Sequence, residues 1–344
     1  MAFSYRTRQR FRRLWAALLT LMLIAVLVLV CWVLWLDRYV VYTRDGVKFD
    51  FSLSPQYPDG VLAVPPTPQE TVDVYYQEFT QPTEPENKEL QHLSGFYVTL
   101  DMLRIHGFDA VKAKIQELPA GTAVMVDVKD IKGEFYYSSS IGHLADDMPI
   151  APMDDLITFL QSGNYYTIAR LPAFRDYWFG LYNVPMGLPK VGGLGSLWAD
   201  TSDNSYCYWL SPAADGVIHR LAQITLELRT RGFDEVLFYD FRYPDTDQVI
   251  VTVDKTEALK KAAADLVNAC TTDRFTVSFT SKDHNFPMPE GRCRLYMDNV
   301  DAEDIVYLRD KLLFTNPEVR WVFLADSNDT RYADYGILRP MPSP

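Results

Sequence analysis

The stretch "GFDEVLFYDFRYP", residues 232–244, contains the end of a helix, a buried strand and a charged turn. The helical pattern before it stops at Gly232, as expected of the glycine that often follows a helix. "EVLFYD" (235–240) then has the composition of an apolar strand, and the chain turns at Pro244. Charged residues directly after a buried strand are typical of the active-site face of α/β enzymes. The stretch therefore predicts an α/β protein with functional side chains at this point.

Strand and helix patterns alternate on both sides of this stretch, from Ser94 to the end of the chain. Strands are predicted at 95–100, 122–129, 165–171, 235–240, 275–280, 293–298 and 320–325, and helices at 108–118, 153–162, 216–231, 254–270 and 302–314. Apolar strands that alternate with helices indicate a parallel sheet, and the length suits a (β/α)8 TIM-type barrel. The eighth strand is either in "DYGILRPM" (334–341) or missing, so the barrel is complete or else distorted. The alternative is an open doubly wound sheet. Its nucleotide-binding versions are disfavoured because no glycine-rich loop follows the first strand.

The N-terminus has the pattern of a membrane anchor. Residues 1–13 include five arginines, and residues 14–36 form an uncharged run of 23 residues, long enough to cross a hydrocarbon core of about 30 Å. The arginines favour a cytoplasmic N-terminus. The alternative, a cleaved signal peptide, is disfavoured because no small-residue cleavage site follows the run. We expect a cytoplasmic tail (1–13), a single transmembrane helix (14–36) and an extracytoplasmic remainder in the cell membrane.

The remainder divides into a connecting segment and a folded domain. Residues 37–93 are expected to be an extended lead-out and a linker, because residues 55–89 contain seven prolines. The barrel domain is expected at 94–340. The whole chain carries a net charge of −12, residues 1–13 contribute +5 and residues 14–36 contribute none, so residues 37–344 carry −17. Such an acidic domain is a poor candidate for binding nucleic acid.

The cysteines and histidines do not predict a metal site. Cys207, Cys270 and Cys293 have no metal-binding spacing, and the five histidines lack a zinc-protease motif. Cys270 and Cys293 either form a disulfide or, with Cys207, are buried thiols. No serine lies in a nucleophile elbow. We expect neither a metal nor a cofactor.

The strand at 122–129 carries charge at its carboxyl end. Because side chains alternate along a strand, Asp127 and Lys129 are expected to point into the barrel, while the valines at 124, 126 and 128 face the helices. Asp127 and Lys129 could then pair in the barrel mouth. The alternative is a solvated loop of Asp127, Lys129 and Asp130.

The next predicted strand, in "YTIARLPAFRD" (166–176), ends with Arg170, followed by Arg175 and Asp176. An arginine at this position can orient a carboxylate or a sugar hydroxyl; alternatively, Arg170 only forms an ion pair with Asp127. The following insertion (196–212) is rich in Trp and Tyr beside Asp200 and Asp203. Its aromatic rings either stack on sugar rings or pack the insertion itself.

Four segments in this order resemble a family of bacterial glycoside hydrolase-like proteins predicted to be TIM barrels. They are "VDVKDIKGEFYYSS" (126–139), "ARLPAFRD" (169–176), "YWLSP" (208–212) and "GFDEVLFYDFRYP" (232–244). The resemblance covers residues 94–270 best. Many members are secreted or membrane-tethered, and the family implies a carbohydrate substrate and carboxylate chemistry. The positions that match the family motifs are Asp127, Lys129, Asp130, Gly133, Arg170, Phe174, Asp176, Trp209, Pro212, Phe233, Asp234, Glu235, Arg242 and Pro244.

The chain departs from the family pattern at the strand in 235–240. The family has Gln where this chain has Leu237, and Asp where this chain has Tyr239, while the acid here follows one residue later as Asp240. An offset of one residue turns a side chain to the other face of a strand. Glu235, Leu237 and Tyr239 are therefore expected to face the barrel interior. Asp240 reaches the mouth only if the strand has ended or a bulge shifts the alternation.

Glycoside hydrolysis usually requires two carboxyl groups. The candidates are Asp240 or Glu235 for one and Asp127 or Asp176 for the other. Substrate-binding candidates are Lys129, Arg170, Tyr239, Arg242 and Trp209. Three hypotheses follow. The protein is a membrane-anchored glycoside hydrolase that acts on a cell-envelope or extracellular polysaccharide, or it is a degenerate barrel that binds a glycan or an envelope protein without hydrolysis. The third is a structural component of the envelope whose barrel has no ligand.

Overall fold

The computed structural model describes residues 22, 40–43, 46–49 and 90–344, with gaps at 194, 203–205, 281–285, 287, 299 and 313–315. The chain divides into two compact units, Met1–Phe79 and Thr80–Pro344. In the first unit, strands β1 (Val40–Thr43) and β2 (Gly46–Phe49) pair antiparallel. The basic tail, the expected transmembrane helix and most of the linker lie outside the described residues. Within the described part of the chain, no helix has both the length and the apolar character needed to cross a membrane.

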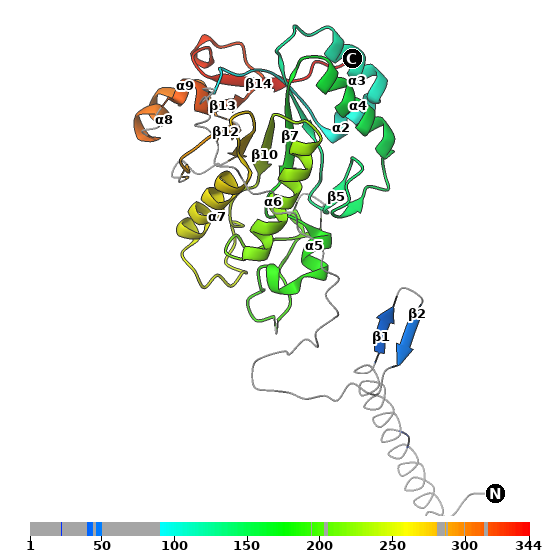
Figure 1. The fold of residues 1–344 in the computed structure, drawn as a ribbon. Coiled ribbons are helices and arrows are strands. Elements are labelled where there is room, and N and C mark those ends of the chain that lie inside the picture. Colours follow the sequence, from blue (N-terminus) through cyan, green and yellow to red (C-terminus); the bar gives the residue numbers. More distant parts are fainter. Residues whose placement is uncertain are drawn as a thin grey trace, which may run out of the picture. The chain divides into compact units, whose positions relative to one another are not determined.

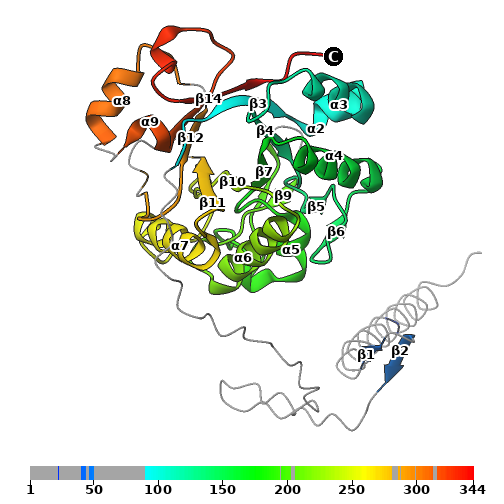
Figure 2. The ribbon, with the colours of Figure 1, turned by 45° about the horizontal axis from the view of Figure 1, so that its top comes forward.

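Eight parallel strands of the second unit form a closed barrel (Figures 1 and 2). Their order around the barrel follows the sequence: β3 (Ser94–Val98), β4 (Ala123–Asp127), β7 (Tyr166–Pro172), β10 (Glu235–Tyr239), β11 (Thr276–Thr280), β12 (Leu295–Asp298), β13 (Trp321–Leu324) and β14 (Gly336–Pro340). The last strand, β14, pairs with the first, β3, and closes the ring. The TIM-type barrel is thus confirmed. Its eighth strand lies within the expected 334–341, and the open sheet is excluded.

Helices lie around the outside of the strands (Figure 2). They are α2 (Leu100–His106), α3 (Phe108–Gln116), α4 (Ile150–Ser162), α6 (Asp215–Thr230), α7 (Lys255–Cys270), α8 (Ile305–Leu312) and α9 (Pro317–Arg320). All five predicted helices are present. The sequence patterns did not separate the short helix α2 from the strand before it, although the Thr99 hydroxyl caps it by accepting from the Met102 amide at 3.2 Å.

Side chains alternate between the two faces of the barrel strands, as predicted. Val124 and Val126 of β4 pack with the outer core under the helices. A separate cluster fills the barrel interior: Leu93, Ala123, Met125, Ile168, Leu237, Tyr296, Val322, Leu324 and Leu338. Leu237 therefore points inward, while Val236 and Phe238 point outward. This arrangement is the period-2 pattern of a strand whose two faces are both buried.

Two small sheets follow the barrel strands β4 and β7. Strand β5 (Glu134–Phe135) pairs with β6 (His143–Leu144), and β8 (Ala199–Asp200) pairs with β9 (Cys207–Tyr208). Helix α5 (Tyr177–Tyr182) and the 3-10 turn η2 (Val184–Met186) lie with β8 and β9 in the insertion after β7. These elements therefore belong to the loops at the carboxyl ends of the strands, where barrel enzymes bind their substrates.

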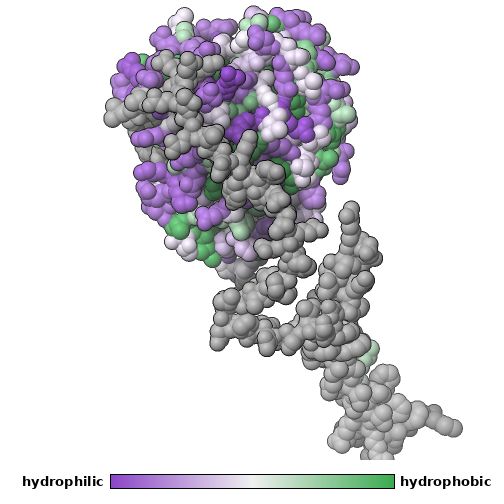
Figure 3. Space-filling view, in the orientation of Figure 1, coloured by the Kyte–Doolittle hydropathy of each residue, from purple (hydrophilic) through white to green (hydrophobic). Residues whose placement is uncertain are grey.

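Hydrophilic residues dominate the visible surface of the barrel (Figure 3), and the described cysteines lie inside it. The visible face of the barrel is mostly hydrophilic, with smaller hydrophobic areas scattered over it (Figure 3). Cys207, Cys270 and Cys293 are buried free thiols. Of the two alternatives for Cys270 and Cys293, the structure therefore has the unbridged one.

Candidate active site at the barrel mouth

Asp127, Arg170 and Tyr239 meet where β4, β7 and β10 end. Asp127 and Arg170 are register partners on neighbouring strands, and Asp127 Oδ1 lies 3.2 Å from Arg170 Nη1. The Arg170 guanidinium carbon lies 4.7 Å from the centre of the Tyr239 ring, a cation–π distance. The predicted alternative for Arg170, an ion pair with Asp127, is therefore present.

Asp127 has the electrostatic environment of a proton donor. Its side chain is 15% exposed. Burial raises the pKa of this carboxyl group, and this effect outweighs the opposing effects of Arg170 and of the Leu100 amide, 3.4 Å from Oδ2. A carboxyl group with a raised pKa keeps its proton to higher pH, which is the property of a general acid.

Tyr239 is a phenol that stays protonated. Burial raises its pKa most, and the charges of Asp127 and Asp240 raise it further, against the lowering effect of Arg170. The inward orientation expected from the strand alternation places the ring beside Arg170. A tyrosine in this environment suits hydrogen bonding or packing against a substrate.

Asp240 follows the last residue of β10 and adopts a left-handed backbone conformation, with φ of 51°. Asp tolerates this conformation better than most residues. The strand has therefore ended, which is one of the two conditions under which Asp240 could reach the mouth. Its carboxylate forms ion pairs with Arg175 Nη1 at 3.3 Å and Arg242 Nε at 3.5 Å, and its side chain is 17% exposed.

Asp298 and Tyr97 were not identified from the sequence. Asp298 ends β12 two residues after the interior residue Tyr296, so it projects from the inner face. Burial raises the pKa of Tyr97, and Asp298 is the next largest cause. Burial lowers the pKa of Arg170, but Asp127, Tyr239 and Asp298 together more than offset it. Asp298 thus acts on the same group of residues as Asp127. The sequence did contain a signal for Asp298, because it is an acid at the end of a predicted strand, but it lies outside the family motifs.

The structure does not bring Glu235 to the mouth. As the first residue of β10 it points inward, as predicted, but at the opposite, amino-terminal end of the barrel. Its side chain is fully buried, forms an ion pair with Arg294, and accepts hydrogen bonds from Tyr166 at 2.8 Å and Tyr296 at 2.9 Å. Glu235 is therefore part of a closed polar network inside the barrel. Contrary to the prediction, it is not placed to act as a catalytic residue in the mouth.

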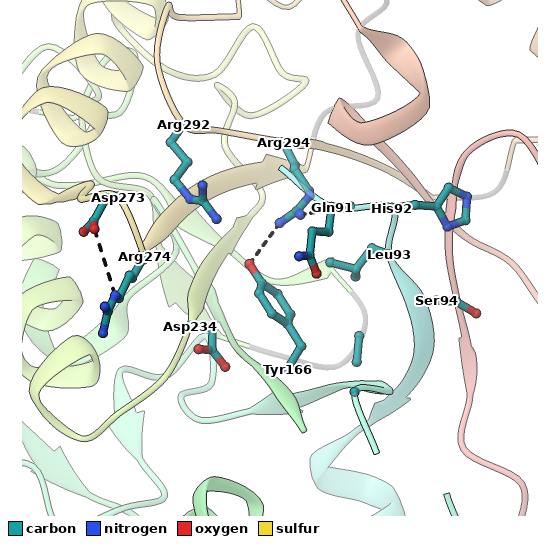
Figure 4. Close-up of a pocket in the computed structure, with 12 residues that line it drawn as sticks. Gln91, His92, Leu93, Ser94, Tyr166, Asp234, Asp273, Arg274, Arg292 and Arg294 are labelled. Carbon is teal, nitrogen blue, oxygen red and sulfur yellow. Dashed lines mark hydrogen bonds and ion pairs between the residues drawn. The ribbon is translucent and has the colours of Figure 1, made fainter. Parts of the chain in front are cut away.

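A pocket of about 250 Å³ lies at this amino-terminal end (Figure 4). Arg274, Arg292 and Arg294 line it, together with Tyr166 and Asp234. The guanidinium group of Arg294 also donates to the carbonyl groups of Gln91 and Val319, at 3.0 and 3.1 Å. The chemistry of TIM barrels is found at the opposite, carboxyl-terminal end. We therefore place the candidate active site at the mouth.

Asp176 and Lys129 form a buried pair of their own. Their charged atoms lie 2.9 Å apart, with side chains 6% and 3% exposed. Asp176 also caps α5 by accepting from the Phe179 amide at 2.7 Å. The predicted pairing of Lys129 with Asp127 is wrong, because β4 ends at Asp127 and the alternation does not extend to Lys129. Neither Lys129 nor Asp176 is placed to contact a substrate in the mouth.

Trp209 is also enclosed. It is 1% exposed, and its indole donates to Asp200 Oδ2 at 2.8 Å. The guanidinium carbons of Arg175 and Arg242 lie 5.6 and 5.0 Å from its ring. Trp209 therefore packs inside the insertion and contacts the two arginines that pair with Asp240. Contrary to the prediction, it is not placed to bind a substrate. Arg242 is 36% exposed and remains a substrate-binding candidate.

Metal-ligating side chains do not cluster within the described part of the chain. The mouth instead presents carboxylates, guanidinium groups and phenols. Residues 95–274, more than half of the chain, match the family model described as "Putative glycosyl hydrolase domain". The chain belongs to this family. The resemblance inferred from the four sequence segments is thereby confirmed.

Several solved structures are similar to the chain, at low identity. A hypothetical protein from Ruminiclostridium thermocellum is 22% identical, with a TM-score of 0.45, over 54% of this chain and 96% of that one. The glycoside hydrolase domain of PelA from Pseudomonas aeruginosa is 12% identical, with a TM-score of 0.45, over 74% and 95%. An exo-β-N-acetylglucosaminidase from Vibrio harveyi is 8% identical, with a TM-score of 0.46, over 69% and 42%. None of the curated proteins compared with the chain matches it.

Proposed function

We propose that the protein hydrolyses glycosidic bonds in a cell-envelope or extracellular polysaccharide, at the mouth of its barrel. The observation that carries the proposal is Asp127, a carboxyl group whose pKa is raised by burial. It lies at a strand end in a domain of a glycosyl hydrolase family. A protonated carboxyl group is what the leaving oxygen of a glycoside needs.

The proposed roles follow from the contacts in the mouth. Asp127 is the general acid, and Asp240 is the second carboxylate, which attacks the sugar or activates water. The charges of Asp127 and Asp240 both raise the pKa of Tyr239, so both carboxylates act on the same phenol. Arg170, Arg242 and Tyr239 orient hydroxyl groups of the substrate. Asp298 is the alternative second carboxylate.

The proposed location follows from the sequence. The 23 uncharged residues 14–36 are proposed to hold the chain in the cell membrane, with the five preceding arginines in the cytoplasm. The barrel would then face the envelope, where a polysaccharide substrate is available. Proteolysis of intact cells, followed by detection of the barrel fragment, tests this location.

Three matched variants test the catalytic roles. Asp127→Asn, Asp240→Asn and Asp298→Asn are compared with Asp310→Asn, whose side chain is 66% exposed on α8. Release of new reducing ends from purified cell-wall and capsular polysaccharides is the measurement. Loss of a general acid or base typically lowers the rate on the order of 10²–10⁴-fold. We expect this loss in Asp127→Asn and in one of the other two mouth variants, with Asp310→Asn unchanged.

A second function is favoured by one specific observation. Tyr239 occupies the inward position where the family pattern has Asp, and Asp240 is held by two arginines. A barrel of this kind could bind a glycan without cleaving it. Retention of the wild-type protein on a polysaccharide that yields no new reducing ends would favour the binding function.

A further inference from the structure

Six aromatic rings form a continuous cluster on the loops that follow β4 and β7. Tyr177, Trp178 and Tyr182 come from α5, His143 from β6, and Tyr206 and Tyr208 from the segment around β9. The rings of Trp178 and Tyr182 are nearly parallel, 12° and 6.0 Å apart, and His143 lies 4.6 Å from Trp178. Tyr177 and Tyr208 stack at 5.5 Å, and Tyr177 contacts Trp178 at 5.0 Å. We call these six residues the aromatic cluster.

Much of the aromatic cluster is open to solvent. Tyr182 is 66% exposed and Tyr206 is 50% exposed. Large aromatic side chains usually bury most of their surface, and exposed groups of them mark binding surfaces. The rings contribute nothing to the closed core under the barrel helices, so their exposure needs another explanation.

A cavity of about 320 Å³ adjoins one end of the cluster and supplies polar groups. Its lining includes Trp178, Tyr182, His143, Asn183, Asp176 and Arg220. Arg220 Nη1 donates to the Ile141 carbonyl at 2.6 Å. The Arg220 guanidinium carbon also lies 5.8 and 5.4 Å from the ring centres of Phe135 and Phe179, so these contacts hold the group beside the cavity.

This combination points to a carbohydrate. The axial C–H groups of a pyranose ring pack on aromatic faces, while its hydroxyl groups need nearby donors and acceptors such as Asn183 and Arg220. The charged side chains that line the cavity are one arginine, Arg220, and one aspartate, Asp176, so its lining has no large excess of either charge. A strongly charged ligand is therefore disfavoured, and a neutral glycan chain fits best.

We propose that the aromatic cluster and the adjoining cavity form an accessory subsite for a neutral glycan chain. The subsite lies on the same end of the barrel as Asp127, because α5 starts directly after Asp176 and its first amides donate to the loop after β4, at Ile131 and Lys132. The inference rests on the proposed function only in that the ligand is a glycan. The subsite would hold the polymer while the mouth acts on one bond. Its residues do not include Asp127, Asp240 or Asp298.

Native affinity electrophoresis of the full-length chain in mild detergent tests the subsite. The gels contain laminarin, hydroxyethyl cellulose or glycol chitin as probes. The variants are Tyr182→Ala and Trp178→Phe, and the matched control is Tyr307→Ala, a tyrosine 60% exposed on α8. Tyr182 is exposed, so its removal should not disturb folding.

We expect at least one probe to retard the wild-type chain, and Tyr182→Ala to weaken that binding about tenfold, as for a residue at the centre of an interface. Tyr307→Ala should bind like wild type. The same probe should also change the tryptophan fluorescence of the wild-type chain, and this change should be smaller in Trp178→Phe. Unchanged retardation of Tyr182→Ala, or no retardation of the wild type by any probe, would overturn the subsite. Neither result depends on hydrolysis, which the reducing-end assay decides separately.

Discussion

At the scale of single residues, the proposed chemistry of the mouth depends on the pKa of Asp127, on which burial and Arg170 have opposite effects. Burial raises its pKa and Arg170 lowers it. Because a raised pKa in the folded state favours the protonated form, the contribution of Asp127 to stability is present at low pH. It is lost as pH rises through the folded-state pKa. The same titration removes the proton that a general acid must donate.

This balance gives a prediction for the pH dependence of activity. The activity should fall on the alkaline side as Asp127 loses its proton. Arg170→Gln removes the positive charge that lowers this pKa, so the alkaline limb should move to higher pH. The profile of kcat/KM against pH measures the shift, with Arg309→Gln, an exposed arginine of α8, as the control. A limb that stays in place in Arg170→Gln would mean that another group titrates.

A second residue-scale prediction concerns Glu235. Removing one partner of a buried ion pair leaves an unpaired charge and typically costs about 3–5 kcal/mol. Glu235→Gln should therefore lower the free energy of unfolding by about that amount, since Arg294 stays buried. Chemical denaturation measures the loss, with the exposed Glu290→Gln as the control. The folded fraction should keep the proposed glycosidase activity. Loss of activity without loss of stability would return Glu235 to the catalytic candidates.

At the scale of elements, the sequence predicted the barrel strands well because each is a short apolar run that lies between helical patterns. The inward positions of Leu237 and Tyr239 followed from the alternation of side chains along a strand. The pattern could not show where a strand stops, so it paired Lys129 with the wrong acid. It also could not show that Trp209 is enclosed, because burial in an irregular insertion depends on contacts between distant segments. Asp298 was overlooked because no motif surrounded it.

The loop after β4 gives an element-scale prediction. Gly133 has φ of +90°, and a Cβ there would lie 2.1 Å from Asp176 Oδ1. Gly133→Ala should therefore displace the Asp176 cap of α5 as well as strain the backbone. Gly121→Ala is the matched control, because its φ is +82° and nothing lies within 4 Å of the added Cβ. Strain alone costs about 1–2 kcal/mol, so thermal unfolding should show a clearly larger loss for Gly133→Ala. Equal losses would argue against the contact with Asp176.

At the scale of the whole molecule, the barrel is closed by its last strand. β14 pairs with both β13 and β3, and its Leu338 fills the interior. Removing residues 334–344 should leave two open strand edges and an exposed apolar interior. We expect this truncated chain to be degraded rapidly by dilute protease and to lose the cooperative unfolding of the full chain. A truncated chain as resistant to protease as the full one would show that closure does not hold the fold together.

The measurement that most directly tests the central claim is the release of reducing ends by the wild-type chain and by Asp127→Asn. Cell-wall and capsular polysaccharides are the substrates, and a thermal unfolding curve verifies that both proteins are folded. The claim predicts release by the wild type and a loss on the order of 10²–10⁴-fold in Asp127→Asn. Equal release by both proteins would contradict the role of Asp127 as the general acid. No release by either would contradict hydrolysis itself.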